Sequence, residues 1–537
     1  MPLLYFDTEV TELSKKQTAP QANGYSEAGA SITRRALKGF TPESSSPNED
    51  IIRNIDLLRK RSRLLYMSSP VATSAINTNR SKVIGVGLGL KAAINRDVLG
   101  MTPEAAKEWQ KRTEAEFSVW ANKPRNCDAI GKNSFADMQQ LALKSWLMSG
   151  DCFVLLKRKP AEPMNPYSLR LHVIEADRVS TPDSFGGATR AGFLEGTVPE
   201  GQPGAGNSVY DGVEIDSDGM VTAYYVSNRY PREYSGEPVK WQRVLAWGEK
   251  TGLANILHIM DSERPDQYRG VPYLAQIIEP LLQTRRYTES ELMAALVQSF
   301  FTAWIQTETS PLEIPMNEVG AGEVNGEEQD DDVSESENEY EMGPGTVLHL
   351  QENEKVVFGN PNAPVSGFDV FMKTMFRMMG AALEMPYDVL IKEYNSSYSS
   401  ARAAIQDAWE AFRTRRSWFV NDMCQPVYEA WLAEAVALGR IKAPGFFDDP
   451  LLRAAWCGAR WIGPAQGILD PLKEARAALL LIDRGIKTHA QVTMEMTGGD
   501  WEENVEQLAK ENKLLRNAGG GTIASMSTGG GEGGDGE

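Results

Sequence analysis

The sequence lacks the features that mark secreted, membrane-spanning and disulfide-rich proteins. Its four cysteines are widely scattered and fit neither a disulfide framework nor a zinc site. No apolar run approaches the ~18 residues that a membrane span needs. The start, MPLLYFDTEV, has neither a basic region nor a sustained apolar stretch. We therefore expect no membrane segment, no secretory signal and assembly in a reducing compartment.

Recognisable catalytic and ligand-binding motifs are also missing. The glycines of Gly85–Gly89 are spaced G-x-G-x-G, which favours a glycine-broken strand over a dinucleotide site. Gly248–Thr251 resembles only half of a P-loop, and Asp216–Gly219 is more typical of a hairpin turn than of a calcium loop. The four histidines lie far apart, and no G-x-S-x-G elbow is present. The sequence thus predicts no catalytic residues, no cofactor and no metal.

Positive charge is in short supply, since 73 acidic residues outnumber 55 basic ones and give a net charge of −18. Proteins that grip DNA by neutralising its phosphates are usually basic, so we expect no tight DNA binding over the whole surface. An acidic wall could still let DNA slide, or the charge could serve solubility alone. The cluster Arg59–Arg63 could touch DNA, form a solvated helix face or contact a neighbouring subunit.

The chain, at 537 residues, is long enough for several domains or subdomains. Its patterns predict an α+β, mainly helical fold. Helical spacing fills 51–83, 103–120 and 134–148, whereas strand patterns dominate from 152 to 258.

Two long apolar helices, at 280–305 and 368–385, flank an unusual segment. Residues 317–341 hold eleven acidic side chains and no basic one, which predicts a solvated loop. The second helix is rich in methionine, a residue that suits a core or a repackable subunit interface. A polar loop follows at 394–400, and then a helical region begins at Ala401.

Four long blocks carry a resemblance to a known family: RKRSRLLYMSSPVATSAINTNRSKVIGVG (59–87), RPDQYRGVPYLAQIIEPLLQTRRYTESELMAALVQSFF (264–301), FRMMGAALEMPYDVLIKEYNSSYSSARAAIQDAWEAFRTRR (376–416) and WIGPAQGILDPLKEARAALLLIDRGIKTHAQVTMEMTGGDWEENVEQLAKE (461–511). From about residue 48 to about residue 516, the sequence resembles phage portal proteins of the lambda type. The acidic stretch 317–341 carries the least of this resemblance.

The resemblance implies a portal fold assembled as a ring of about twelve subunits at one capsid vertex. Carried onto this chain, and with polar ends read as unstructured, it implies eight parts: a flexible arm (1–50), an α+β wing (51–258), a stem helix region (259–305), a clip with the acidic loop (306–365), a second stem helix (366–385), a tunnel loop (386–400), a helical crown (401–516) and a disordered tail (517–537).

The resemblance also implies where function resides. The tunnel loop would meet DNA through Lys392, Tyr394, Asn395, Ser396 and Ser397. The stem helices would pack against neighbouring subunits through six apolar residues: Leu296, Phe300, Met372, Met375, Phe376 and Met379.

The implied partners are other copies of the chain, the major capsid protein, scaffolding protein, the terminase large subunit, a head–tail connector or adaptor, and double-stranded DNA that passes without sequence preference. The implied location is the virion, after assembly in the bacterial cytoplasm. Two rivals stand beside this reading: an enzyme acting on nucleic acid or the cell wall with a dispersed site, and a different structural ring of the phage particle. The mass and shape of the purified protein separate these classes.

Overall fold

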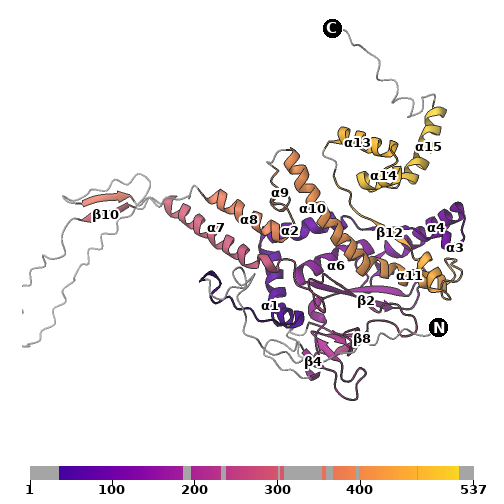
Figure 1. Cartoon of the computed structure of the whole chain (residues 1–537), viewed down its shortest axis with the longest axis horizontal. Coiled ribbons are helices and arrows are strands. Elements are labelled where there is room, and N and C mark those ends of the chain that lie inside the picture. The colour runs from indigo at the N-terminus through magenta and orange to yellow at the C-terminus, as the bar shows by residue number, and fades with distance from the viewer. Residues whose placement is uncertain are drawn as a thin grey trace, which may run out of the picture.

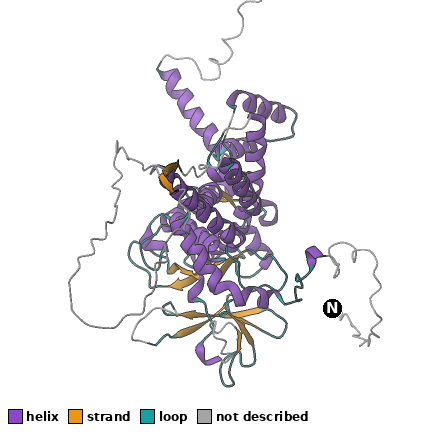
Figure 2. Ribbon diagram, turned by 90° about the vertical axis from the view of Figure 1, so that its left-hand side faces the viewer, coloured by secondary structure: helices purple, strands orange, loops and turns teal. Residues whose placement is uncertain are grey.

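The computed structural model describes residues 35–185, 195–230, 238–299, 303–307, 354–358, 367–394, 398–467 and 470–518. Helices dominate this part of the chain, and strands concentrate between residues 151 and 260, so the predicted α+β, mainly helical class is confirmed. Most strands gather at one end of the body and most helices at the other (Figure 2). The N-terminal arm up to residue 34, the acidic stretch 317–341 and the tail from residue 519 lie outside the described residues.

The N-terminal helices are bounded by side-chain caps. The first, α1, starts one residue after Ser46, whose hydroxyl accepts a hydrogen bond from the Glu49 amide in a capping box. This start is slightly earlier than the helical spacing predicted from residue 51. Thr102 caps the predicted start of α4, and Ser134 caps α6. The helices here are α1 (Pro47–Ser68), α2 (Pro70–Asn79), the π-helix η3 (Arg80–Ile84), α3 (Arg96–Leu99), α4 (Pro103–Ala121), α5 (Pro124–Cys127) and α6 (Phe135–Ser149).

Two antiparallel sheets form the strand-rich part. A three-stranded sheet has the order β3-β2-β9, from β2 (Asp151–Arg158), β3 (Leu169–Glu175) and β9 (Ile256–Met260). A five-stranded sheet runs in sequence order from β4 (Glu195–Thr197) through β5 (Ser208–Tyr210), β6 (Val213–Ile215) and β7 (Val221–Ser227) to β8 (Trp241–Leu245). Apolar side chains from both sheets, including Phe153, Val213 and Tyr224, form a second, smaller core.

Residues 208–215, within the segment where strand patterns were predicted to dominate, form two short strands. The chain turns back at Asp211 and Gly212, which both have positive φ, so that β5 pairs with β6. A Cβ on Gly212 would lie 2.5 Å from the Ser180 amide nitrogen, which explains the glycine. The turn predicted at 216–219 is confirmed, since the Asp216 carboxylate accepts hydrogen bonds from the Asp218 and Met220 amides.

The largest core joins segments that are far apart in the sequence. Buried residues from α2 through β3, such as Trp120, pack with Trp431 and others from the helices α10 (Tyr398–Phe419), η7 (Val420–Cys424), α11 (Gln425–Ala437) and α12 (Pro450–Trp456). The strands β1 (Gly89–Ala92) and β12 (Ala459–Ile462) pair antiparallel and close this arrangement. Residues of the predicted wing and of the first half of the predicted crown therefore share one core.

Three C-terminal helices stand apart from that core: α13 (Pro471–Asp483), α14 (His489–Thr497) and α15 (Trp501–Asn517). None of them contains a buried residue. They gather beside one another at one edge of the molecule, and the C-terminus follows α15 (Figure 1).

The basic cluster in α1 has partners inside the chain. Arg59 is buried and binds Asp151 and Asp211, each at 3.1 Å, while Arg269 binds the same two carboxylates at 2.6 Å. Burial alone would raise the pKa of Asp151, but the charges of Arg269 and Arg59 outweigh this effect and hold the pKa well below its usual range. Arg59 consequently lies in neither a DNA-binding nor a solvated face.

Candidate functional site

Two helices project from the body side by side (Figure 1): α7 (Ile278–Ser299) and α8 (Phe368–Ala382), which we call the stem helices. The prediction of a helix to residue 305 is wrong at its end, because β10 (Ala303–Thr307) follows α7. This strand pairs antiparallel with β11 (Glu354–Phe358) beyond the stem helices. The rest of the predicted clip lies outside the described residues.

Aromatic contacts hold the stem helices together. The ring of Tyr287 on α7 stacks on Phe368, with centroids 5.5 Å apart, and meets Phe371 edge-on at 4.9 Å. The roots of both helices enter the main core through Ile278 and Leu281 on α7 and through Met379 on α8. The stem is thus anchored at its base.

The remainder of the stem exposes apolar side chains to solvent. Met378 is 65% exposed, and the other members of this set are Leu292, Met293, Leu296, Val370 and Phe371. Large apolar groups gathered on a projecting two-helix element are typical of a surface that another molecule covers.

The six residues predicted for the subunit interface are distributed differently. Leu296 is exposed, Met372 is half-buried, and Phe300 lies outside the described residues. Met375 and Phe376 are half-buried against the main core of their own chain. Met379 is only 1% exposed, so assigning it to a subunit interface is wrong. Helical periodicity found the apolar residues of α8 but could not say which of them face the chain's own body.

The segment predicted as the tunnel loop, 386–400, is partly helical. It contains the short helix α9 (Tyr387–Ile391), and α10 begins at Tyr398, before the expected start at Ala401. Lys392 and Tyr394 are exposed, whereas Asn395, Ser396 and Ser397 lie outside the described residues. Lys392 ends α9 in a left-handed conformation, with φ of 64°, and so reverses the chain direction there.

Polar contacts fix the base of this loop. The Tyr387 hydroxyl donates to the Glu393 carboxylate at 2.6 Å, and Lys373 of α8 approaches the same carboxylate at 3.9 Å. The hydrogen bond to Glu393 raises the pKa of Tyr387 to about 12, so the phenol stays protonated at neutral pH. The Ser74 hydroxyl of α2 donates to the Leu390 carbonyl at 2.7 Å. The loop therefore starts from a fixed point near the C-terminal end of α8, at the base of the stem.

Arg415 of α10 clamps the end of α8 to the body. Its guanidinium donates to Glu384 at 2.7 Å and to Asn79 at 2.9 Å, and it lies 4.7 Å from the centre of the Tyr273 ring. The Tyr273 hydroxyl donates to the Leu383 carbonyl. Arg415 is buried, and its contacts join α8 and α10, the helices on the two sides of the loop. No sequence motif predicts these contacts.

The described residues of this site do not form a catalytic arrangement. Within the described part of the chain, no three His, Cys, Asp or Glu side chains are grouped as metal ligands would be. No described helix is long and apolar enough to cross a membrane. The arrangement consists of a projecting apolar stem and an anchored polar loop, which suits assembly and passive contact.

The comparison with protein families decides the classification. The family model described as phage portal protein, lambda family, matches residues 33–416. The chain belongs to this family. Members are structural components of the virion and not enzymes, in agreement with the prediction from the missing motifs.

Individual portal proteins match over nearly the whole chain. Portal protein B of Escherichia phage lambda is 23% identical over 90% of this chain and 88% of its own length. The portal protein of Escherichia phage N15 is 22% identical over 90% and 89%. A probable portal protein of Halomonas phage phiHAP-1 is 23% identical over 90% and 86%.

Among solved structures, the neck of a native gene transfer agent particle, computed with C12 symmetry, aligns with a TM-score of 0.37 and 12% identity. That alignment covers 86% of this portal chain and 98% of the other chain.

Proposed function

We propose that this portal protein forms a closed ring of about twelve copies around a channel for DNA. The observation that carries the proposal is the exposed apolar face of the stem helices. Within the described residues, α7 and α8 contact each other through Tyr287 and still leave Met378 and Leu292 largely in solvent, so the described part of one subunit does not cover that face. Packing against the next subunit through a heterologous contact buries the face and closes a ring.

The loop at the end of the stem is the part we assign to DNA. Its exposed Lys392 and Tyr394, with Asn395, Ser396 and Ser397, offer one cation and several neutral polar groups to phosphates. Glu393 is held by Tyr387 and turned to the stem, so it does not need to enter the channel. A single cation in each copy gives weak, sequence-independent contact, which suits DNA that moves in both directions.

The remaining assignments follow from the family. The wing and crown would meet capsid and scaffolding proteins, and the clip would bind the terminase large subunit and the head–tail adaptor. Assembly would take place in the bacterial cytoplasm, and the portal would have no need of catalysis because ATP hydrolysis belongs to the terminase.

The mass and shape of the purified full-length chain test the ring. Light scattering should give about 710 kDa, twelve times the subunit mass of 59.3 kDa, and negative-stain microscopy should show particles with a central hole. A monomer or dimer that persists at high concentration and with scaffolding protein present would refute the ring.

A further inference from the structure

The helices α13, α14 and α15, which we call the C-terminal strap, lie outside the apolar cores of the described chain. None of the three contains a buried residue, and none contributes a side chain to the main core. On α15, Trp501 and Leu508 remain 37% and 41% exposed. Because burial of apolar surface is the main source of packing stability, these contacts give the strap little hold on the body.

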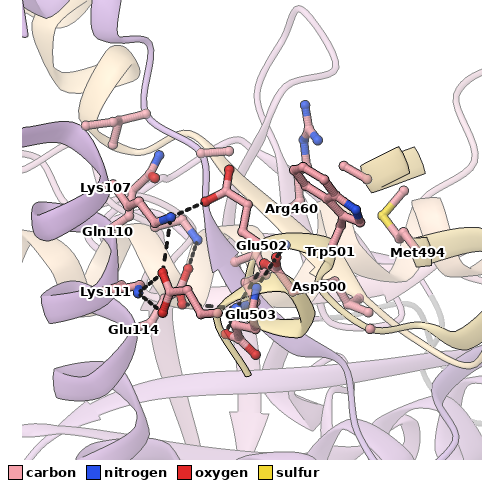
Figure 3. A pocket seen from close by; sticks show the side chains of 18 residues that line it. Lys107, Gln110, Lys111, Glu114, Arg460, Met494, Asp500, Trp501, Glu502 and Glu503 are labelled. Carbon is pink, nitrogen blue, oxygen red and sulfur yellow. Dashed lines mark hydrogen bonds and ion pairs between the residues drawn. The ribbon is translucent and has the colours of Figure 1, made fainter. Parts of the chain in front are cut away.

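Ion pairs join α15 to the body (Figure 3). Three lysines of α4 and β1 bind carboxylates at the start of α15. The pairs are Lys107 with Glu502 at 2.6 Å and with Glu506 at 3.3 Å, Lys111 with Glu506 at 3.0 Å, and Lys91 with Glu503 at 2.6 Å and with Asp500 at 3.3 Å. All of these side chains are at least 25% exposed, so dissolved ions reach every pair. Exposed ion pairs are each weak, and salt screens them.

A cavity of about 440 Å³ lies between the strap and the body. It is lined by α4, β1 and β12 on the side of the body and by α14 and α15 on the side of the strap. Gln110 of α4 and Met494 of α14 both line it (Figure 3). Close-packed side chains are the rule where two elements share a core, so this space indicates that the strap stands off from α4 and is bridged to it by charge.

The strap also has contacts that hold it together. The ring of His489 on α14 stacks on Trp501 of α15, with centroids 5.5 Å apart. Where α13 turns into α14, the Ile486 amide donates to the Leu481 carbonyl at 2.9 Å. The three helices are therefore connected to one another independently of the ion pairs that connect α15 to the body.

We propose that the C-terminal strap is a salt-sensitive latch, which the ion pairs of α15 close and which opens as a unit while the body stays folded. Arg416 donates to the Pro464 carbonyl at 3.0 Å, so the chain stays tied to the body shortly before the strap begins. Opening takes the carboxylates of α15 away from Lys91, Lys107 and Lys111 and leaves a positively charged surface on a chain with a net charge of −18. The latch does not depend on the proposed ring, because all of these contacts lie within one subunit.

The accessibility of a thiol beneath the strap tests the latch in the full-length protein. Gln110→Cys places this reporter on the face of α4 that lines the cavity, and Glu108→Cys places a control thiol at an exposed position on the other side of the same helix. The reagent is a maleimide that carries a polyethylene glycol chain too bulky for the closed cavity. The four native cysteines are buried, so they contribute little background.

Salt should open the latch. Between about 0.1 and about 1 M sodium chloride, the screening length falls from about 10 to about 3 Å. The labelling rate of the reporter thiol should then rise by at least about tenfold, because the ion pairs no longer hold α15, and that of the control thiol should change by less than about twofold.

Charge reversal separates the latch from a general effect of salt. Lys107→Glu with Lys111→Glu breaks the pairs and should give fast labelling of the reporter already at low salt. Adding Glu502→Lys and Glu506→Lys should restore slow, salt-sensitive labelling, because the reversed pairs re-form. The matched control is Glu495→Gln, which breaks an ion pair inside the strap and should leave the labelling rate unchanged.

Three results would overturn the latch. The first is an equal labelling rate of the reporter at low and high salt, and the second is fast labelling that the double reversal does not slow. The third is a salt-dependent rise that the control thiol shares, since this would show that α4 itself opens and that the strap does not move on a folded body.

Discussion

Replacing Met378 with aspartate should prevent ring assembly. The side chain is 65% exposed on the stem, and full burial of a methionine stabilises by about 1.5–3 kcal/mol. The exposed two-thirds therefore offers about 1–2 kcal/mol to each contact between subunits. Met378→Asp removes that gain and adds several kcal/mol for a carboxylate taken out of water without a partner. We expect a total loss of at least about 3 kcal/mol per contact, or more than about 100-fold in its association constant.

The assay is the concentration at which rings form, followed by light scattering across a dilution series. Met378→Asp should raise this concentration by at least about 100-fold or abolish rings. Met378→Leu conserves volume and should assemble within about tenfold of the natural protein. The matched control is Met220→Asp, because Met220 is 59% exposed in the turn between β6 and β7, away from the stem.

Circular dichroism and the unfolding midpoint of the monomer guard against misfolding, since Met378 contributes little to the subunit core. Rings of normal mass from folded Met378→Asp would show that this face is not covered by a neighbour. Loss of rings in Met220→Asp as well would show that the effect of the charge is not specific to the stem.

Three further outcomes are expected. Asp151→Asn leaves two buried arginines short of a counter-charge and should lower the free energy of unfolding, measured by urea denaturation, by about 3–5 kcal/mol. The control Asp56→Asn breaks an exposed ion pair and should lower it by less than about 0.5 kcal/mol. Similar values for both variants would refute the role of the buried network. Because the folded pKa of Asp151 is depressed, its contribution is present above the unfolded pKa and is lost as pH falls through the folded one, so Asp151→Asn should weaken the acid dependence of unfolding. Replacing residues 392–397 with glycines should leave rings intact and impair DNA packaging or retention, and unchanged packaging would contradict the tunnel-loop assignment.

Local signals in the sequence predicted most helices of the body correctly. They failed where the same residue pattern fits both a helix and a strand. Thr102 before Pro103 marks the start of α4 because a side-chain cap and a proline both act within the first turn. The apolar run after Ser299 fits a continued helix as well as a strand, and only pairing with β11, more than 45 residues later, makes it β10. The five-residue helix α9 is too short for periodicity to show.

Long-range partners explain the errors in the candidate site. Arg59 looks like a solvent-facing cation in the sequence, yet Asp151 and Asp211 neutralise it from 92 and 152 positions away. Met379 and Met378 are adjacent apolar residues on one helix, and the body buries the first and leaves the second in solvent. A periodic pattern gives the apolar residues of a helix but not the surface that each of them faces.

In the described part of the chain, the stem helices differ from the body in how far a single subunit covers their apolar side chains. The body pairs its buried charges internally, as at Asp151, and holds a large apolar core, so we expect it to fold within a single subunit. The stem helices project from that body and expose a group of large apolar side chains, among them Met378 and Leu292. In the proposed ring, a neighbouring subunit covers the exposed apolar side chains of the stem, and the stability of each stem then depends on the ring being complete.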